Sequence, residues 1–129
     1  MDLEDKDLSS KVINAAVRVH KSLGPGFLES FYEEALCLEL KNSQIPYERQ
    51  KTVMIFHLGQ PIGEHRLDLL VDGKLIVELK AISQLESVHY SILRSYLKAT
   101  NLQSGLLMNF CSMPLMVKRV GREYFPNHS

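Results

Sequence analysis

Two short apolar runs in the segment 65–82, HRLDLLVDGKLIVELKAI, carry three ionisable side chains that could do chemistry: Asp68, Glu78 and Lys80. Ionised side chains are rarely buried unless they are paired or bind a metal. Two carboxylates on adjacent strands are suitable ligands for Mg²⁺, which keeps several waters and contacts substrate phosphates. A lysine beside such an ion can orient or deprotonate a water and stabilise charge on a phosphate. The segment is therefore either the solvated side of a sheet or a site for phosphate chemistry.

These two interpretations differ in whether Asp68 and Glu78 point to the same face of the sheet. Side chains alternate along a strand, so Glu78 and Lys80 share one face. On the preceding run, Leu67 and Leu69 share the face opposite to Asp68. An Asp-Gly dipeptide joins the runs, which is a strong hairpin signal. The facing of the two carboxylates therefore depends on the length of this turn.

Two registers of the hairpin give opposite answers. A plain two-residue turn pairs Val71 with Lys74, and this register turns Asp68 to the face away from Glu78. A three-residue turn with a left-handed glycine bulge instead pairs Leu70 with Lys74. Asp68 then lies diagonal to Glu78, and both carboxylates can reach one cation. A metal site thus requires the bulged turn or an equivalent bulge, whereas a solvated charged face requires neither.

The rest of the chain supplies the elements that position these residues, in the order α-α-β-β-β-α-β. Apolar residues recur at helical spacing in segments 8–23, 27–41 and 86–99. Strands are predicted over 51–58, 63–71, 74–81 and 104–110, and 116–120 is a further candidate strand. The helix between the third and fourth strands suits a parallel pairing with a right-handed crossover. The predicted fold class is α/β, a mixed central β-sheet flanked by α-helices, in a single domain over residues 1–129.

Composition narrows the kind of partner and the compartment. Fifteen basic and fifteen acidic residues give a formal charge of zero, so any contact with nucleic acid must be local, brief or helped by a partner. Cys37 and Cys111 have no CxxC spacing, and we expect both to be reduced and buried. The acidic, polar N-terminus is unlike a signal peptide, and no apolar run reaches membrane-spanning length. A cytoplasmic protein without a membrane partner is expected.

The spacing of other residue types argues against other chemistries. Five histidines show no HExxH or paired Cys/His spacing, which argues against zinc. Gly24-Pro25-Gly26 lacks the lysine and the preceding strand of a phosphate-binding loop. Tyr32 is predicted to be a core residue and Glu33 an exposed charge.

The order Asp68, then Glu78-Leu79-Lys80 on the next strand, resembles the D…ExK signature of the PD-(D/E)XK nuclease superfamily. The earlier stretch LGPGFLESFYEEAL contains Gly26-x-x-Glu29-x-x-Tyr32. This spacing resembles the motif of the GxxExxY proteins, a compact branch of that superfamily. The likeness extends from about residue 12 to residue 110, and it implies the superfamily's restriction-endonuclease-like αβββαβ core.

The resemblance implies roles for five residues. Asp68 and Glu78 would bind a divalent metal, Mg²⁺ or Mn²⁺, with the backbone carbonyl of Leu79 as a further ligand. Lys80 would position the attacking water and stabilise the transition state. Glu29 would reach the same metal directly or through water. The implied activity is hydrolysis of phosphodiester bonds in nucleic acid, with DNA favoured over RNA.

One departure from the superfamily's pattern puts efficient cleavage in question. Related nucleases carry a glutamine on the later helix in a Q-x-x-x-Y arrangement; Tyr96 matches the tyrosine, and Ile92 stands at the glutamine position. Ile92 is predicted to extend the apolar, inward stripe of the helix. The competing interpretation is therefore a module that keeps the nuclease fold, and even the metal, without cutting. Such a module would act through nucleic acid, a protein partner or a homodimer.

Overall fold

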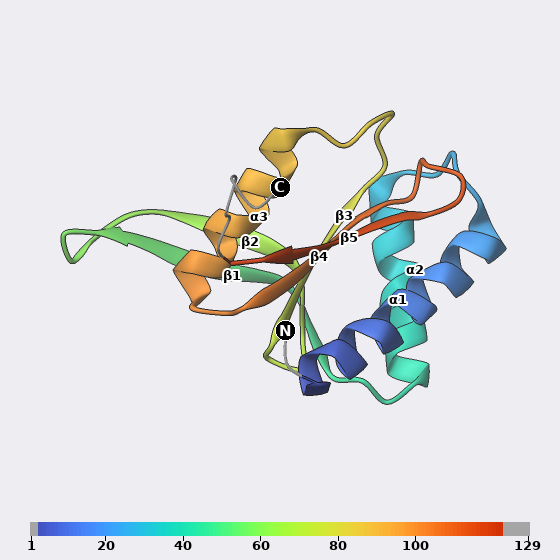
Figure 1. Ribbon diagram of the computed structural model, residues 1–129, viewed down its shortest axis with the longest axis horizontal. Helices are drawn as coiled ribbons and strands as arrows, with labels where there is room; N and C mark the ends of the chain where they lie inside the picture. The colour runs from blue at the N-terminus through green and yellow to red at the C-terminus, as the bar shows by residue number, and fades with distance from the viewer. Residues whose placement is uncertain (1–2, 123–129) are drawn as a thin grey trace.

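The apolar periodicities of the chain fold into three helices and five strands, which a computed structural model describes over residues 3–122 (Figure 1). They are α1 (Leu3–Leu23), α2 (Glu29–Asn42), β1 (Tyr47–His57), β2 (Gln60–Val71), β3 (Leu75–Lys80), α3 (Ser87–Thr100), β4 (Ser104–Asn109) and β5 (Met116–Gly121). The predicted element order is confirmed, and β5 is the further candidate strand. The start of β1 is corrected to Tyr47, because its pairing with β2 already begins there.

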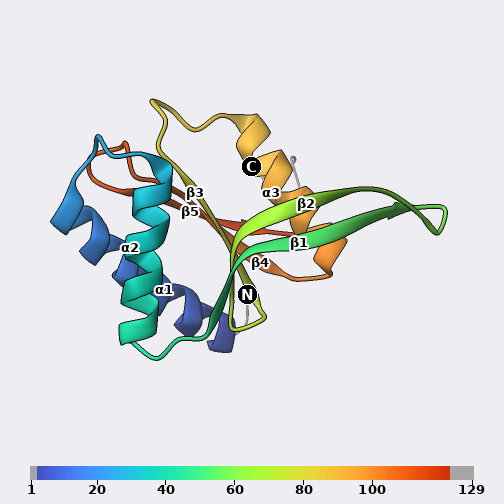
Figure 2. The same cartoon turned by 180° about the vertical axis from the view of Figure 1, so that it is seen from behind.

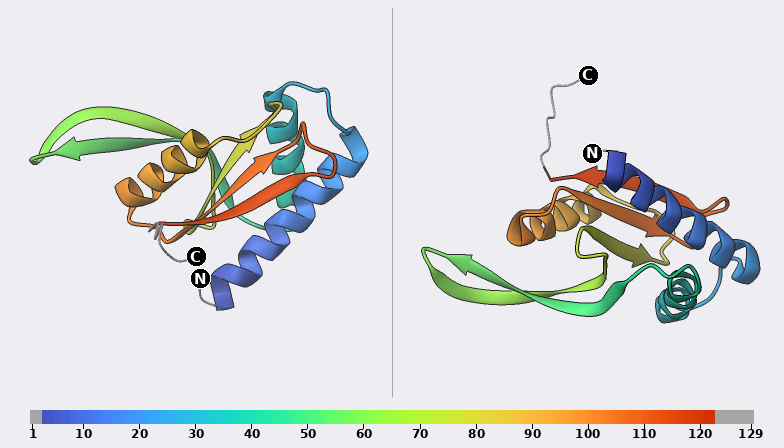
Figure 3. Two further views of the ribbon diagram at one scale, coloured as in Figure 1. Left: turned by 45° about the horizontal axis from the view of Figure 1, so that its top comes forward. Right: turned by 90° about the horizontal axis from the view of Figure 1, so that it is seen from below.

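The five strands form one mixed sheet in the order β1-β2-β3-β4-β5. β3 and β4 are parallel and are joined through α3, whereas all other neighbouring pairs are antiparallel. The predicted parallel pairing across a helix and the predicted α/β class with a mixed sheet are confirmed. α1 and α2 cover one face of the sheet and α3 covers the other (Figure 3).

Two apolar clusters fill the spaces between these layers. The larger cluster joins α1 and α2 to side chains from β2, β3 and β4, and it includes Tyr32, Leu36, Leu69, Val77, Leu79 and Phe110. The smaller cluster lies under α3 and consists of Leu67, Ile76, Leu93, Leu97, Leu107 and Val120. Cys37 is buried in the larger cluster, as predicted. Cys111 is exposed, so the prediction that it is buried is wrong.

The β1–β2 hairpin extends beyond the rest of the sheet as a two-stranded arm (Figure 2). β1 and β2 contain 11 and 12 residues, whereas β3 contains 6. β2 pairs with β3 only over residues 69–71, so the outer part of β2 has no β3 neighbour. We call residues 51–67 the arm. Its exposed large apolar residues are Met54, Phe56, Leu58 and Ile62.

The β1–β2 hairpin twists where the arm leaves the sheet, so that its two faces exchange sides. Leu69 packs in the cluster under α1 and α2, but Leu67, two residues away, packs in the cluster under α3. Regular alternation would put both on one face, as predicted, so that prediction is wrong. Opposite them on β1, Gln50 has a left-handed φ of 51° and interrupts the ladder between Arg49 and Lys51. This irregularity re-aims the strand in the way that a β-bulge does.

The β2–β3 turn has neither of the predicted registers. Val71 pairs with Leu75, so three residues, 72–74, form the connection. Asp72 and Gly73 both have positive φ, 52° and 65°, and the N–H of Lys74 donates to the carbonyl of Val71 at 3.0 Å. This is the geometry that Asp-Gly favours in tight hairpins, followed by one further residue. Continuing the register by one pair sets Asp68 directly opposite Glu78, on the same face.

In the part of the chain that the structure describes, no helix has both the length and the apolar character needed to cross a membrane.

A buried asparagine holds the carboxyl ends of β3 and β4 together. Asn109 is fully buried, and its Oδ1 accepts from the N–H groups of Ile82 and Cys111 at 3.1 and 3.2 Å. Its Nδ2 donates to the carbonyl of Ile82 at 2.9 Å. The segment that leaves β3 after Lys80 is therefore fixed by side-chain hydrogen bonds where the parallel ladder ends.

We predict that Asn109→Ala lowers the free energy of unfolding by about 2–4 kcal/mol, because it removes a fully buried amide and the three hydrogen bonds that it makes to backbone groups. Urea denaturation followed by circular dichroism measures this change. Asn14→Ala, on the exposed face of α1, is the matched control and should change stability by less than about 0.5 kcal/mol. An equal change in both variants would contradict the role given to Asn109.

Candidate active site

The site lies where β2 and β3 separate, and two carboxylates replace the missing ladder there. The N–H of Asp68 donates to Oε2 of Glu78 at 2.9 Å, and the N–H of Leu79 donates to Oδ2 of Asp68 at 2.9 Å. Each carboxylate thus bonds to the main chain of the opposite strand. Glu78 is 7% exposed and Asp68 is half-buried. The reciprocal bonds hold two like charges side by side at the fork.

Lys80 and Glu29 complete the cluster from β3 and α2. Lys80 follows Glu78 by two residues on β3, is half-buried, and through its charge opposes the rise in pKa that burial causes at Asp68, Glu78 and Glu29. Glu29 is the first residue of α2, at the exposed rim of the site, and its carboxylate accepts a hydrogen bond from the N–H of Ala81. The structure therefore brings all four predicted side chains into one electrostatic cluster.

Burial and mutual repulsion make this cluster costly to ionise. Desolvation is the largest cause that raises the pKa of Glu78, to about 8, and the charge of Asp68 adds to it. Desolvation also raises the pKa of Asp68, which the N–H of Leu79 opposes. Partial desolvation raises the pKa of Glu29, and Lys80 opposes that shift. Perturbed carboxyl groups that gather at one point are typical of functional sites.

The start of α2 is held in place by the tyrosine of the Gly-x-x-Glu-x-x-Tyr spacing. Tyr32 is fully buried and stacks on Phe110, with ring centroids 4.6 Å apart. Its hydroxyl donates to the carbonyl of Gly24 at 2.6 Å and accepts from the N–H of Phe27 at 3.1 Å. The prediction that Tyr32 packs in the core is confirmed, and its hydroxyl also anchors the turn that delivers Glu29.

Gln50 and Glu33 form a side of the site that the sequence did not reveal. Glu33 was predicted to be an exposed charge, but it is 8% exposed and pairs with Arg49 at 3.0 Å, so that prediction is wrong. The amide of Gln50 donates to Glu33 at 2.8 Å and also bonds to Asp68. The helical spacing of Glu33 with Leu36 and Leu40 could have indicated an inward position. The left-handed backbone of Gln50 has no comparable signal in the sequence.

α3 forms the remaining wall. Tyr96 is half-buried, and desolvation together with the charges of Glu78 and Asp68 raises its pKa. Its ring lies against His65 of the arm, with centroids 4.6 Å apart. Ile92, one turn earlier, was predicted to face inward, but it is 41% exposed, so that prediction is wrong. Leu93 and Leu97 fill the space under the helix instead.

The donor set fits a hard divalent cation. Asp68 and Glu78 supply carboxylate oxygens, and adjacent buried carboxyl groups with raised pKa values gain most from a neutralising charge. Over residues 3–122, no group of three or more His, Cys, Asp or Glu side chains is arranged to hold a metal ion. A bound cation would therefore depend on the carboxylate pair, backbone oxygen and water, as is usual for Mg²⁺.

The family model described as the PD-(D/E)XK nuclease superfamily matches residues 6–120. The chain belongs to this superfamily. Among solved structures, that of SSO0001 has a similar fold, with a TM-score of 0.59 at 16% sequence identity. The match covers 74% of this PD-(D/E)XK chain and 50% of SSO0001, so the chain spans about half the length of that structure. No curated protein matches the chain.

Membership of the PD-(D/E)XK superfamily gives the cluster a chemical context. Proteins of the superfamily typically use divalent metals, and the superfamily is described as one of nucleases. The mixed sheet, with α1 and α2 on one face and α3 on the other, agrees with the restriction-endonuclease-like fold.

The pKa of Glu78 predicts how the stability of the metal-free protein depends on pH. The folded-state pKa of about 8 lies above the ordinary value of 4.5, so the folded protein binds the extra proton. Stability is therefore highest below pH 4.5 for this group and is lost as pH rises through 8. We expect Glu78→Gln to remove a slope of up to ~1.4 kcal/mol per pH unit from the free energy of unfolding.

Urea titrations between pH 5 and pH 9 in a chelating buffer measure that slope. Glu64→Gln, at an exposed position of the arm, is the matched control and should keep the slope of the parent. An unchanged slope in Glu78→Gln would show that Glu78 ionises normally in the folded protein.

Proposed function

We propose that this protein is a metal-dependent nuclease that hydrolyses phosphodiester bonds in nucleic acid, with DNA as the favoured substrate. The observation that carries the proposal is the reciprocal pair of Asp68 and Glu78 with Lys80 beside it, at the fork between β2 and β3. Gly26, Glu29 and Tyr32 support assignment to the GxxExxY branch.

Asp68, Glu78 and the carbonyl of Leu79 would hold Mg²⁺ or Mn²⁺, and Glu29 would add to the same site directly or through water. The chemistry that the ion supplies when bound is polarisation of the scissile phosphate and a lowered pKa of a bound water. The remaining roles would belong to side chains of the protein. On each of Asp68 and Glu78, one oxygen accepts from the main chain of the opposite strand, which would fix the carboxylate for this role.

Lys80 would act on the water and on the phosphate. It shares a strand face with Glu78, so its ammonium group is directed to the same side of β3 as the acidic pair. A positive charge there can hold a water by hydrogen bonding and stabilise the extra negative charge of the transition state. Glu29, whose carboxylate is close enough to Lys80 for the lysine charge to oppose the rise in pKa that burial causes, would help to fix the lysine.

A second candidate function is a module that binds metal and nucleic acid without cutting. The observation in its favour is Ile92, which is 41% exposed on the wall of the site where related nucleases carry a glutamine. An exposed isoleucine cannot hydrogen-bond a phosphate or a water. Metal binding supports either function, whereas turnover supports only the first.

We predict that Lys80→Ala reduces cleavage by about 100-fold or more in the presence of Mg²⁺, because it removes charge stabilisation in the transition state. Single-turnover cleavage of labelled single-stranded and duplex DNA measures this loss. Lys118→Ala, on the exposed edge strand β5, is the matched control and should cut at the rate of the parent. If Lys80→Ala cuts as fast as the parent, the assigned mechanism is wrong.

Metal binding can be tested independently of cleavage. We predict saturable binding of Mg²⁺ or Mn²⁺ by isothermal titration, and its loss in Asp68→Ala, because a single remaining carboxylate is a poor site for a hard cation. Asp72→Asn, in the exposed β2–β3 turn, removes a carboxylate but suits the left-handed backbone there, and should bind as the parent does. Equal binding by Asp68→Ala would place the metal elsewhere, and binding without cleavage would favour the second candidate function.

A further inference from the structure

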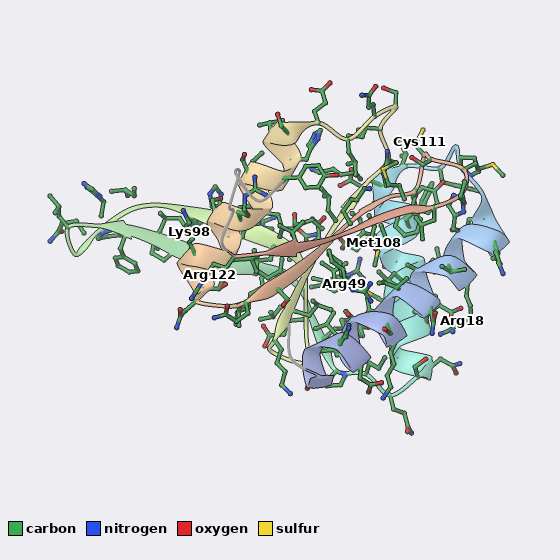
Figure 4. All side chains as sticks on the ribbon, in the orientation of Figure 1. Arg18, Arg49, Lys98, Met108, Cys111 and Arg122 are labelled. Carbon is green, nitrogen blue, oxygen red and sulfur yellow. The ribbon has the colours of Figure 1, made fainter. Side chains whose placement is uncertain are left out.

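A groove of about 430 Å³ lies between the arm and α3. The arm contributes Ile55, Phe56 and His65 to its lining, and α3 contributes Ser95 and Lys98. Figure 4 shows Lys98 on the side of α3 that meets the β1–β2 ribbon. The groove forms because the hairpin exchanges its faces near Gln50, which carries the arm across α3. Core packing between the sheet and this helix therefore does not explain which side chains line the groove.

The groove is adjacent to the acidic cluster. His65 lines it, and the ring of His65 lies 4.6 Å from the ring of Tyr96, centroid to centroid. Tyr96 in turn is close enough to Asp68 and Glu78 to experience their charges. These two rings, tilted at 58° to each other, lie between the groove and the carboxylates. A strand bound in the groove would therefore reach, past these rings, the site where a phosphodiester would be cut.

The groove has the side chains that unpaired nucleotides need. Phe56 is 61% exposed although it is aromatic and lies on a projecting strand, where it offers a free ring face. Bases of single strands stack on such rings, and this stacking is largely independent of sequence. Lys98 on the opposite wall can contact a phosphate, whereas the hydroxyl of Ser95 beside it donates to the carbonyl of Ile92 at 2.6 Å. One wall of the groove can thus contact the base of a nucleotide, and the opposite wall can contact its phosphate.

We propose that this groove binds unpaired nucleotides of the substrate next to the scissile phosphate, so that the preferred substrate contains a single-stranded segment. This inference rests on the proposed nuclease function and specifies its substrate class. A regular duplex conceals its base faces and is bound mainly through rows of cations. The groove instead combines an aromatic ring and aliphatic side chains with one lysine, in a chain of zero formal charge.

Gly63 gives a way to close the groove without disturbing the fold. It pairs with Ile55 across the arm and precedes His65 by two residues, so a side chain there would project on the face of these two residues. A Cβ at Gly63 would have no atom within 4 Å, and its φ is not in the left-handed region. Valine also suits a strand better than glycine. Gly63→Val should therefore fold normally and narrow the groove.

The test is the binding of a fluorescein-labelled dT12 oligonucleotide and a 12-base-pair duplex, measured by anisotropy with Mg²⁺. All variants are made in the Lys80→Ala background, so that cleavage does not interfere. We expect Phe56→Ala to weaken dT12 binding about tenfold, the loss of one base stack, and Gly63→Val to weaken it at least as much. The control variant is Leu58→Ala, at the tip of the arm, where Leu58 is 88% exposed and outside the groove.

The proposal is overturned if Phe56→Ala and Gly63→Val, both folded by circular dichroism, bind dT12 as tightly as their parent. It is also overturned if duplex binding falls as much as dT12 binding does. Sedimentation tests a third outcome. If Phe56→Ala converts a dimer into a monomer, and dT12 binding falls only together with dimerisation, then the arm is an interface between copies and the proposal is overturned.

Failure of this inference can be distinguished from failure of the nuclease function. Methyl p-nitrophenyl phosphate, a phosphodiester without a base, is offered with Mg²⁺ to the otherwise unaltered protein and to its Phe56→Ala variant. Equal hydrolysis by both, with weaker dT12 binding by Phe56→Ala, supports both proposals. If neither hydrolyses it or any nucleic acid, the nuclease function fails, while the dT12 comparison still decides what the groove binds.

Discussion

The acidic site depends on one interaction, the exchange of hydrogen bonds between each carboxylate of the Asp68–Glu78 pair and the main chain of the other's strand. Where β2 and β3 diverge, these bonds satisfy two N–H groups that would otherwise lose their ladder partners. The same bonds force two acidic groups together in a poorly solvated place, which raises the pKa of both. The hydrogen bonds to these two N–H groups thus offset the electrostatic cost of placing two carboxylates together. The fold therefore keeps a pair of negative charges that favours the binding of a cation.

The elements around the pair restrict how that cost can be relieved. Asn109 fixes the chain just beyond Lys80, so the lysine remains on the same side as the carboxylates. Tyr32 fixes the turn before α2 and thereby the position of Glu29. On the opposite side, Arg49 and Gln50 bond to Glu33 and keep a further acidic group paired next to the site. Relief must therefore come from protonation or from a ligand of opposite charge.

The sequence was sufficient to predict the element order and the mixed sheet, because periodicity and the Asp-Gly turn are local signals. Asp68, Glu78 and Lys80 were distinguished as charges within apolar runs, whereas Glu29 was indicated only by the resemblance to a known family. The sequence was not sufficient for the register, since the turn includes Lys74 as a third residue and no local rule required this. The inversion of the arm was also missed, because it depends on a left-handed glutamine whose conformation is imposed by its neighbours. Ile92 was placed inside because its helix has apolar residues on more than one side, and tertiary packing selected Leu93 and Leu97 instead.

The three-residue turn of residues 72–74 also restricts how this chain can change in length over evolution. Insertion or deletion of one residue would invert β3 relative to β2, and the positions of Glu78 and Lys80 would exchange faces with those of Val77 and Leu79. A change of two residues would restore the facing of the acidic pair. Surface loops ordinarily vary freely in length. In descendants and relatives that retain the site, this exposed turn should instead vary by even numbers of residues, so that the parity of its length is inherited together with the carboxylates.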